Sequence, residues 1–197
     1  MREAAVANGG VAHTLLQALF WLWAGSEVLI RVTRPRHTGV RQDRETRLVI
    51  MLGLLGGLGG GSVVAGARRG PWIANHSWVL FGAGLVLGLA GIALRLWAVH
   101  TLGRYFQLHL VVQEGHRVVR EGPYRIIRHP SYAGPILTCI GIGLALDNWV
   151  SLVLCAVLPT AAMVRRIVVE ERMLLTGLGD DYARYSRDTS RLLPGVW

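Results

Sequence analysis

This chain of 197 residues contains no lysine, so all 21 of its basic residues are arginines. Only 12 residues are acidic, which leaves a formal net charge of +9 at pH 7. In a soluble protein this excess would suggest a nucleic-acid partner, because cationic side chains neutralise phosphates. However, 52% of the residues are hydrophobic, which is more than an ordinary soluble domain contains. We therefore expect contacts with membrane lipids and no nucleic-acid partner.

Cysteine is also scarce: Cys139 and Cys155 are the two in the chain, and each lies inside an apolar run. We interpret both as buried free thiols, which behave as small hydrophobic side chains. The histidines at positions 100, 109, 116 and 129 lack the close pairing of a zinc motif, and neither cysteine lies near them. We therefore predict no metal site. The sequence contains no internal repeat, which excludes a solenoid.

The chain does contain long hydrophobic runs. Residues 11–30, 48–67 and 77–99 each supply about 20 positions, enough for a helix to cross a hydrocarbon core of roughly 30 Å. Residues 131–146 and 149–164 are shorter, and Asp147-Asn148 between them is typical of a tight turn. We predict an all-α integral membrane protein with about five transmembrane helices. The first run is longer than a signal-peptide core and ends beside arginines, so we expect a retained helix.

The arginines are unevenly distributed between the two ends of these helices. Residues 31–47, 104–128 and 165–191 hold most of them, whereas the opposite side carries Arg2, Arg68 and Arg69. Because basic residues mark the cytoplasmic side of a membrane, we predict a multi-pass protein of the cell (inner) membrane. Its N-terminus would lie outside, and its active site and C-terminus in the cytoplasm. We divide the chain into a three-helix membrane region, 1–99, and a cofactor-binding and catalytic region, 100–197, within one integrated domain.

Glycines recur at four-residue spacing in two of the runs, at Gly53, Gly57 and Gly61 and at Gly84 and Gly88. Small residues at this spacing allow helices to approach closely in lipid. A phosphate-binding glycine loop would instead follow a strand. The glycines therefore predict interfaces between helices.

Two ionisable residues, Glu27 and Arg95, lie inside the first three apolar runs. Charge within a membrane is costly and is a candidate for function by default. We expect Arg95 to extend to the interface, because it lies near a helix end. We expect Glu27 to pair with Arg31 at i,i+4.

The polar chemistry of the chain concentrates in residues 120–134, between apolar runs. Pro130 disfavours the helical conformation at His129, and Ser131 is suited to cap the helix that follows. A helix N-terminus beside a fixed histidine and two tyrosines is a favourable binding site for a ligand that carries a carboxylate or phosphate. The alternative is that these side chains only contact lipid headgroups.

A second polar cluster follows the last apolar run. We expect that helix to continue beyond the bilayer with Arg166 and Glu170 on one face and Glu171 about 100° away. As a surface ion pair, Arg166 and Glu170 would contribute less than about 0.5 kcal/mol. Two adjacent carboxylates at an apolar boundary instead suit a ligand with an amine, a ribose hydroxyl or a sulfonium, and the arginine suits an anionic acceptor.

Taken in order, these motifs resemble the isoprenylcysteine carboxyl methyltransferase family, within the wider group of integral-membrane methyltransferases that includes phospholipid N-methyltransferases. The resemblance covers residues 102–194, and the N-terminal half carries no matching motif. The matching residues are Leu102-Gly103, Val111-Val112-Gln113, Gly122, Tyr124, Arg128-His129-Pro130-Ser131-Tyr132, Gly134, Arg166, Glu170-Glu171, Leu174, Gly179, Tyr182, Tyr185 and Leu193-Pro194.

The resemblance implies methyl transfer from S-adenosyl-L-methionine to a lipophilic acceptor that enters from the bilayer, with a carboxylate (as in isoprenylcysteine) or a thiol favoured. By motif position it implies that Arg166 and Glu170 are catalytic, that Arg166 binds the acceptor, and that residues 179–194 form a cap. The implied cofactor-binding residues are Gln113, His116, Arg117, Val118, Val119, Tyr124, His129, Pro130, Ser131, Tyr132, Glu170 and Glu171.

Two other functions stay open at this point. A membrane reductase of the sterol or steroid type would use NADPH, whose pyrophosphate the arginines of residues 117–128 could contact. Glu170 and Glu171 disfavour it, because paired carboxylates repel phosphates. A non-catalytic membrane scaffold is disfavoured because Arg166 and Glu170 keep a register suited to catalysis. The identity of the acceptor and the oligomeric state also stay open.

Overall fold

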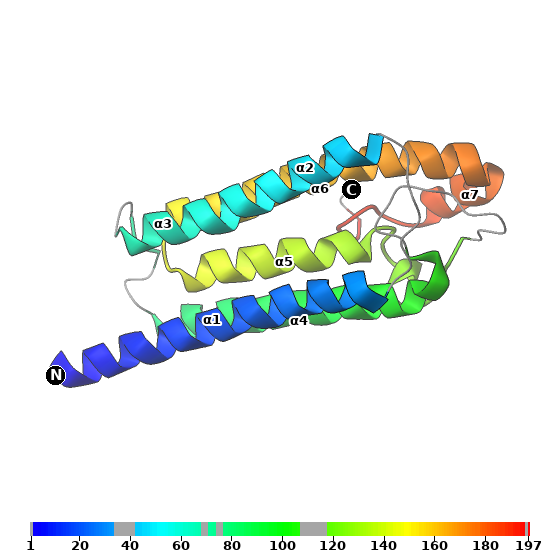
Figure 1. The fold of residues 1–197 in the computed structure, drawn as a ribbon. Coiled ribbons are helices and arrows are strands. Elements are labelled where there is room, and N and C mark those ends of the chain that lie inside the picture. The colour runs from blue at the N-terminus through cyan, green and yellow to red at the C-terminus, as the bar shows by residue number, and fades with distance from the viewer. Residues whose placement is uncertain (1, 34–41, 68–70, 74–76, 107–117, 196) are drawn as a thin grey trace.

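The computed structural model describes residues 2–33, 42–67, 71–73, 77–106, 118–195 and 197, and the elements in them are helical (Figure 1). The α-helices are α1 (Arg2–Thr33), α2 (Gln42–Leu54), α3 (Gly60–Gly66), α4 (Trp78–Leu102), α5 (Pro130–Ala145), α6 (Trp149–Leu178) and α7 (Asp180–Asp188). A π-helical turn, η1 (Leu55–Gly59), joins α2 to α3, and two short 3₁₀ turns are η2 (Gly103–Tyr105) and η3 (Gly122–Arg125).

Within the described residues, four stretches are long and apolar enough to cross a membrane, namely Gly10–Thr33, Leu48–Gly66, Trp78–Leu102 and Trp149–Leu178. The fifth apolar helix is α5, which has only 16 residues. These five coincide with the five predicted runs, so the all-α membrane fold is confirmed. The last of them continues well beyond the predicted run, as expected, and α7 follows as a helical cap.

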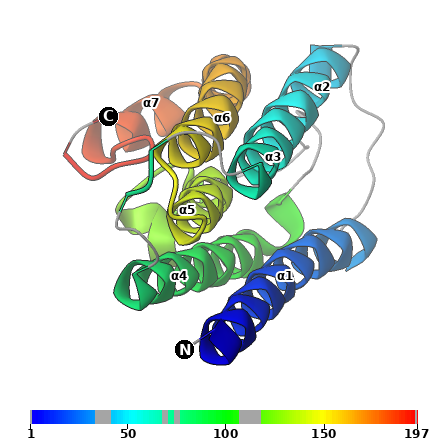
Figure 2. The same ribbon diagram turned by 90° about the vertical axis from the view of Figure 1, so that its left-hand side faces the viewer.

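The helices lie side by side around α5 (Figure 2). Helix α5 packs between α4 and α6, while α1 lies on α4, and α2, η1 and α3 lie along α6. The predicted glycine interface is confirmed along α6. A Cβ atom at Gly53 would lie 2.8 Å from the Cβ of Ala162, and one at Gly57 would lie 2.9 Å from the carbonyl oxygen of Leu154. Only glycine allows backbones to approach this closely.

A second glycine interface joins α4 to α5. Cβ atoms at Gly84 and Gly91 would lie 2.6 Å and 2.5 Å from the carbonyl oxygens of Gly141 and Gly134. Gly141 and Gly134 in turn face the backbone of α4. The two helices are therefore in direct backbone contact along most of the length of α5.

The predicted tight turn between the last two membrane helices is also confirmed. Asp147 has a positive φ of 50°, and the Asn148 side chain accepts a hydrogen bond from the Ser151 backbone N–H at 3.0 Å, which caps α6. The Trp149 N–H donates to the Pro71 carbonyl at 3.1 Å, so the segment before α4 lies against this turn. The turn makes α5 and α6 antiparallel neighbours.

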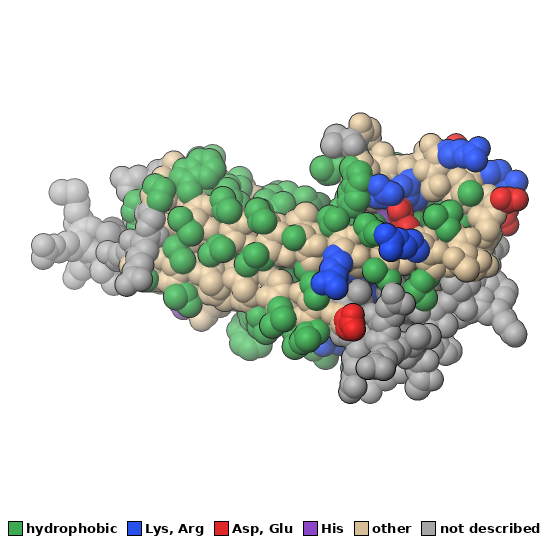
Figure 3. Space-filling view, turned by 90° about the horizontal axis from the view of Figure 1, so that it is seen from above, with side chains coloured by type: hydrophobic (Ala, Val, Ile, Leu, Met, Phe, Trp, Pro, Cys, Tyr) green, Lys and Arg blue, Asp and Glu red, His purple; other side chains and the backbone are tan. Residues whose placement is uncertain are grey.

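Hydrophobic and charged side chains separate along the bundle (Figure 3). Green apolar side chains are spread along the length of the face in view, whereas arginines and acidic residues gather toward the end where α7 lies. Large apolar residues such as Val79 and Val86 are exposed on α4, as expected for a surface that faces lipid. Residues from the ends of α4 and α6 and the start of α5 meet at the charged end.

Candidate active site

Helix α5 begins at the charged end, and its start is fixed by a proline. Pro130 is the first helical residue and holds His129 outside the helical region at φ −121° and ψ 52°, as predicted. The prediction that Ser131 caps this helix is wrong. His129 occupies the cap position, and its own side chain makes no capping hydrogen bond. Because proline is favoured at the first helical position, the helix starts two residues earlier than a cap at Ser131 would imply, and Ser131 lies inside its first turn.

Tyr132, also in this first turn, connects the two predicted catalytic residues. Its hydroxyl donates to a Glu170 carboxylate oxygen at 2.7 Å and accepts from the Arg166 Nε–H at 2.9 Å. Arg166 is buried, with 4% of its surface exposed, whereas Glu170 is half-buried. The structure therefore links a cation, a phenol and a carboxylate in one array, where the first turn of α5 packs against α6.

The neighbouring carboxylate, Glu171, has a different environment. One oxygen accepts from Arg128 Nε at 2.8 Å and lies 3.4 Å from His129 Nε2, and the other accepts from Arg191 Nε at 2.7 Å. Three potential cations thus surround a buried carboxylate, so its charge is compensated within the protein. The predicted role of Glu171 in cofactor binding stays a prediction, and both of its oxygens already have protein partners.

This network also attaches the C-terminal segment to the start of α5. Arg128 donates from Nη1 to the backbone carbonyls of Ser186 and Thr189. The backbone N–H groups of Arg128 and His129 donate to the carbonyls of Ser190 and Arg191 at 2.8 Å and 3.0 Å. Gly179, at φ 55°, forms the turn between α6 and α7 that reverses the chain toward this position.

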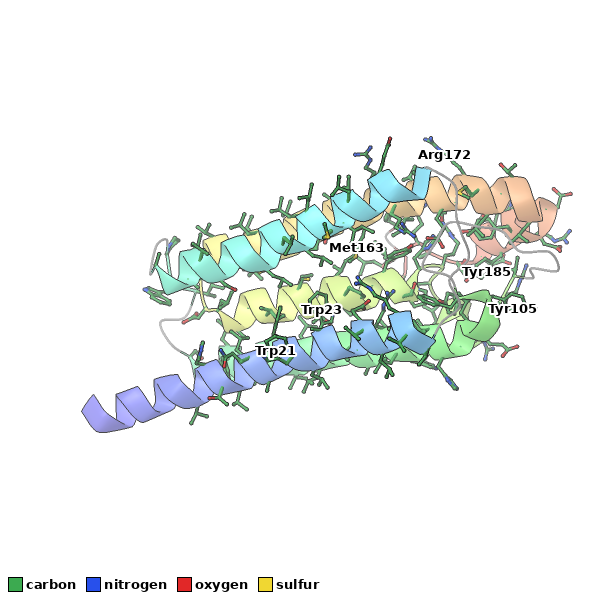
Figure 4. All side chains as sticks on the ribbon, viewed as in Figure 1. Trp21, Trp23, Tyr105, Met163, Arg172 and Tyr185 are labelled. Atoms are coloured by element: carbon green, nitrogen blue, oxygen red, sulfur yellow. The ribbon has the colours of Figure 1, made fainter. Side chains whose placement is uncertain are left out.

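Three buried tyrosines complete this end of the molecule. Tyr124 lies in η3, and the Tyr185 hydroxyl of α7 donates to its backbone carbonyl at 2.8 Å. Figure 4 shows Tyr185 at the charged end of the bundle, together with Tyr105 and Arg172. The hydroxyl of Tyr182 is buried and has no hydrogen-bond partner within the described residues. Burial first, and then the nearby charges of Glu171 and Glu170, raise the pKa of Tyr182, so it stays a neutral donor.

The structure brings together one part of the predicted site, while other predicted residues lie outside the described part of the chain. It gathers the α5 start and the α6 carboxylates, and the buried Tyr124 of η3 lies near Ser131 and Glu170. Val118 and Val119 are half-buried and precede η3. Gln113, His116 and Arg117 lie outside the described residues. The roles of all these residues in cofactor binding stay predictions.

Two expectations about membrane charges are wrong. Arg95 does not extend to the interface but is buried, and Glu27 pairs with it instead of with Arg31. The spacing along one helix suggested a local partner, whereas the packing of α1 on α4 provides a buried one. Tyr182 and Arg191 also contact or approach the carboxylates without having been assigned to the site. Tyr182 belongs to the matching C-terminal motif, which gives no contact partner, whereas Arg191 lies outside the matching residues.

Part of this chain is similar to known isoprenylcysteine methyltransferases. Residues 84–176 match the model of the isoprenylcysteine carboxyl methyltransferase (ICMT) family. The Protein-S-isoprenylcysteine O-methyltransferase B of Arabidopsis thaliana is 34% identical over 129 residues, which cover 64% of this chain and 64% of that protein. The uncharacterized protein YpbQ of Bacillus subtilis (strain 168) is 32% identical over 98 residues, or 50% of this chain and 57% of that protein.

A solved structure has a similar fold. It is described as that of the eukaryotic intramembrane Ras methyltransferase ICMT, and it superposes with a TM-score of 0.56 at 29% sequence identity. The superposition covers 59% of this chain and 43% of that one. The chain therefore spans less than two thirds of the length of these relatives, and the matched part includes the start of α5 and the array of α6.

Proposed function

We propose that this chain, which belongs to the isoprenylcysteine carboxyl methyltransferase family, is an integral-membrane methyltransferase that uses S-adenosyl-L-methionine. The observation that carries the proposal is the array of Arg166, Tyr132 and Glu170, which lies within the residues that the family model matches. The bound cofactor would supply an electrophilic methyl group on a sulfonium. The protein would have to align donor and acceptor and exclude water.

The residues present fit this cofactor. Glu170 is half-buried and next to the α5 N-terminus, which suits it to a sulfonium, an amine or a ribose hydroxyl. Tyr182 supplies a buried hydroxyl without a partner within the described residues, and a buried donor of this kind is costly unless a ligand accepts from it. We propose that Glu170 and Tyr182 contact the cofactor and that α7 covers it.

For the acceptor we propose a lipophilic molecule with a carboxylate, or alternatively a thiol. Arg166 is a buried cation close to the apolar length of α6, so an acceptor carboxylate beside it would be paired in a low-dielectric setting. A carboxylate is ionised at neutral pH and needs no strong base. Tyr132 would fix the guanidinium and Glu170 relative to each other.

We further propose that the charged end of the bundle lies in the cytoplasm. Arg165, Arg172 and Arg184 are exposed on α6 and α7 at this end, and such residues are retained on the cytoplasmic side of a membrane. A lipid-borne acceptor would then reach Arg166 from the bilayer, while the water-soluble cofactor would enter from the cytoplasm.

The test is calorimetric titration of the detergent-purified full chain with S-adenosylhomocysteine and, separately, with NADPH. The proposal requires saturable binding of S-adenosylhomocysteine and none of NADPH. The reverse result would assign the same end of the molecule to a reductase. Binding of neither compound would leave a scaffold.

Two variants assign the roles within the array. Glu170→Ala should weaken S-adenosylhomocysteine binding by about 10- to 100-fold, the cost of losing a charged hydrogen-bond partner. Arg166→Ala should preserve that affinity and lower turnover with a prenylated carboxylate acceptor; Arg166→Lys serves if the alanine variant does not fold. Arg172→Ala, an exposed arginine of the same helix, is the matched control and should change neither quantity.

A further inference from the structure

Glu27 of α1 and Arg95 of α4 form an ion pair between two membrane-spanning helices, close to the charged end of the bundle. The Nε and Nη2 atoms of Arg95 donate to the two carboxylate oxygens of Glu27 at 3.0 Å and 3.2 Å. The two side chains are 10% and 18% exposed, for Arg95 and Glu27 respectively. Such a two-point contact between buried groups has a fixed geometry, and removal of one partner leaves a buried charge uncompensated.

Arg95 also contacts the two chain segments that lead into the candidate site. Its Nη1 atom donates to the backbone carbonyl of Ser131 in the first turn of α5 at 2.6 Å. Its guanidinium lies 5.5 Å from the centre of the Phe106 ring, just after η2. One side chain therefore links α1, α4, the start of α5 and the exit from α4.

These contacts argue against Arg95 as a ligand for an acceptor. Each of its three guanidinium nitrogens already donates to the protein, two to Glu27 and one to Ser131. The carbonyl of Ser131 belongs to the residue immediately before Tyr132, whose hydroxyl connects Arg166 and Glu170. A shift of this turn would move Tyr132 relative to α6. Glu27 lies outside residues 84–176, the part of the chain that the family model matches.

We propose that Glu27 and Arg95 are a positioning pair: Glu27 orients Arg95, and Arg95 holds the first turn of α5 so that Tyr132 meets Arg166 and Glu170. The inference rests on the proposed function for its effect on cofactor binding, but its structural half is independent of that function. Helix α1 thereby becomes part of the machinery that supports the site and is more than a membrane anchor.

The experiment compares Glu27→Ala with wild type in the detergent-purified full chain by two readouts. The first is amide hydrogen exchange in the first turn of α5, where the N–H groups of Tyr132 and Ala133 donate to the His129 carbonyl at 3.0 Å each. The second is S-adenosylhomocysteine affinity. The variant should exchange faster in this turn and bind about tenfold more weakly, as expected for coupled groups in contact.

Thr138→Ala is the matched control. Thr138 is fully buried at the interface between α4 and α5, where its hydroxyl contacts the carbonyls of Gly88 and Gly134, but it lies farther along the helix from the site. This control should lower the unfolding temperature without changing first-turn exchange or affinity. Should Glu27→Ala fail to fold, Glu27→Gln keeps one oxygen acceptor and should shift both readouts in the same direction, by about threefold in affinity.

The outcomes separate the two proposals. Faster exchange in the first turn of α5, specific to the Glu27 variants, supports the pair. Unchanged exchange there, or an equal change in the Thr138 variant, overturns it. If wild type binds no S-adenosylhomocysteine, the proposed function fails, and the exchange readout alone decides the pair. If Tyr132→Phe and Glu27→Ala weaken binding additively, the route through Tyr132 is wrong.

Discussion

The interface between α4 and α5 changes its chemistry along its length. In the membrane half, glycines such as Gly84 and Gly91 place the two backbones in direct contact. At the charged end, the same two helices meet through the buried guanidinium of Arg95 and the carbonyl of Ser131. In lipid, contact between small residues replaces the hydrophobic drive. A buried charge stabilises only when all its partners are in place.

This difference shows that one set of residues fixes the spacing of the helices, and another set fixes the positions of the polar side chains. The glycine interfaces set the distance between helices and tolerate almost no added atom. The charged end holds its side chains through directional contacts. Adjacent residues can differ there, because Glu171 is surrounded by three basic side chains while Glu170 contacts Tyr132. Substitutions in the two regions should therefore differ in effect, with the largest loss of stability in the membrane half.

The largest effect is expected at the centre of the glycine interface. Gly91→Ala would place a Cβ atom 2.5 Å from the Gly134 carbonyl oxygen and from the Thr138 hydroxyl oxygen. Because backbone atoms cannot rotate away, α4 and α5 must separate, at a cost near 3 kcal/mol, the upper part of the range for overpacking. The measurement is the unfolding temperature in detergent.

Its matched control is Gly82→Ala on the same helix, where the added Cβ meets nothing within 4 Å. Alanine favours a helix over glycine by up to about 1 kcal/mol, so this variant should be as stable as wild type or more stable. Equal destabilisation of the two variants would mean that the glycines serve helix flexibility and not close packing.

An intermediate effect is expected at the charged end. Glu171→Ala removes the carboxylate that pairs with Arg128 and Arg191, and should cost about 2 kcal/mol. This is less than for a fully buried pair, because the Arg191 side chain is 35% exposed. Since these contacts attach the C-terminal segment, trypsin should cleave after Arg184 and Arg187 faster in this variant.

Asp181→Ala provides the control for this prediction. Asp181 pairs with Arg184 on the surface of α7, where both side chains are more than half exposed, and the pair should contribute no more than about 0.5 kcal/mol. Its cleavage rate should match that of wild type. If both variants are cleaved equally slowly, Glu171 does not attach the segment.

The smallest effect on stability is expected for Tyr182→Phe. The lost hydroxyl is buried and has no partner within the described residues, so its removal should leave stability unchanged or raise it slightly. S-adenosylhomocysteine affinity should nevertheless fall, by about 3- to 10-fold for one neutral hydrogen bond. Tyr185→Phe, which loses a hydrogen bond to the Tyr124 carbonyl, should show the reverse pattern of lower stability and unchanged affinity.

Local patterns in the sequence were enough for much of the fold. Run length identified the first three membrane segments because the bilayer thickness fixes how many residues a helix needs. The last two runs are shorter, and the turn at Asp147-Asn148 separated them. Glycine spacing identified the helix interfaces, and Pro130 identified the conformation of His129. The ordered motif pointed to the family whose model matches residues 84–176. Each of these signals can be recognised along the chain, without knowledge of which segments contact one another.

Partners across the bundle were decided only by tertiary structure. Spacing suggested that Glu27 pairs with Arg31, and instead the packing of α1 on α4 provides Arg95. Adjacent in the sequence, Glu170 and Glu171 have separate partners because successive residues of a helix point about 100° apart and meet different elements. The sequence determines which side chains reach the membrane boundary, and the packing of helices distant in the chain determines which of them meet.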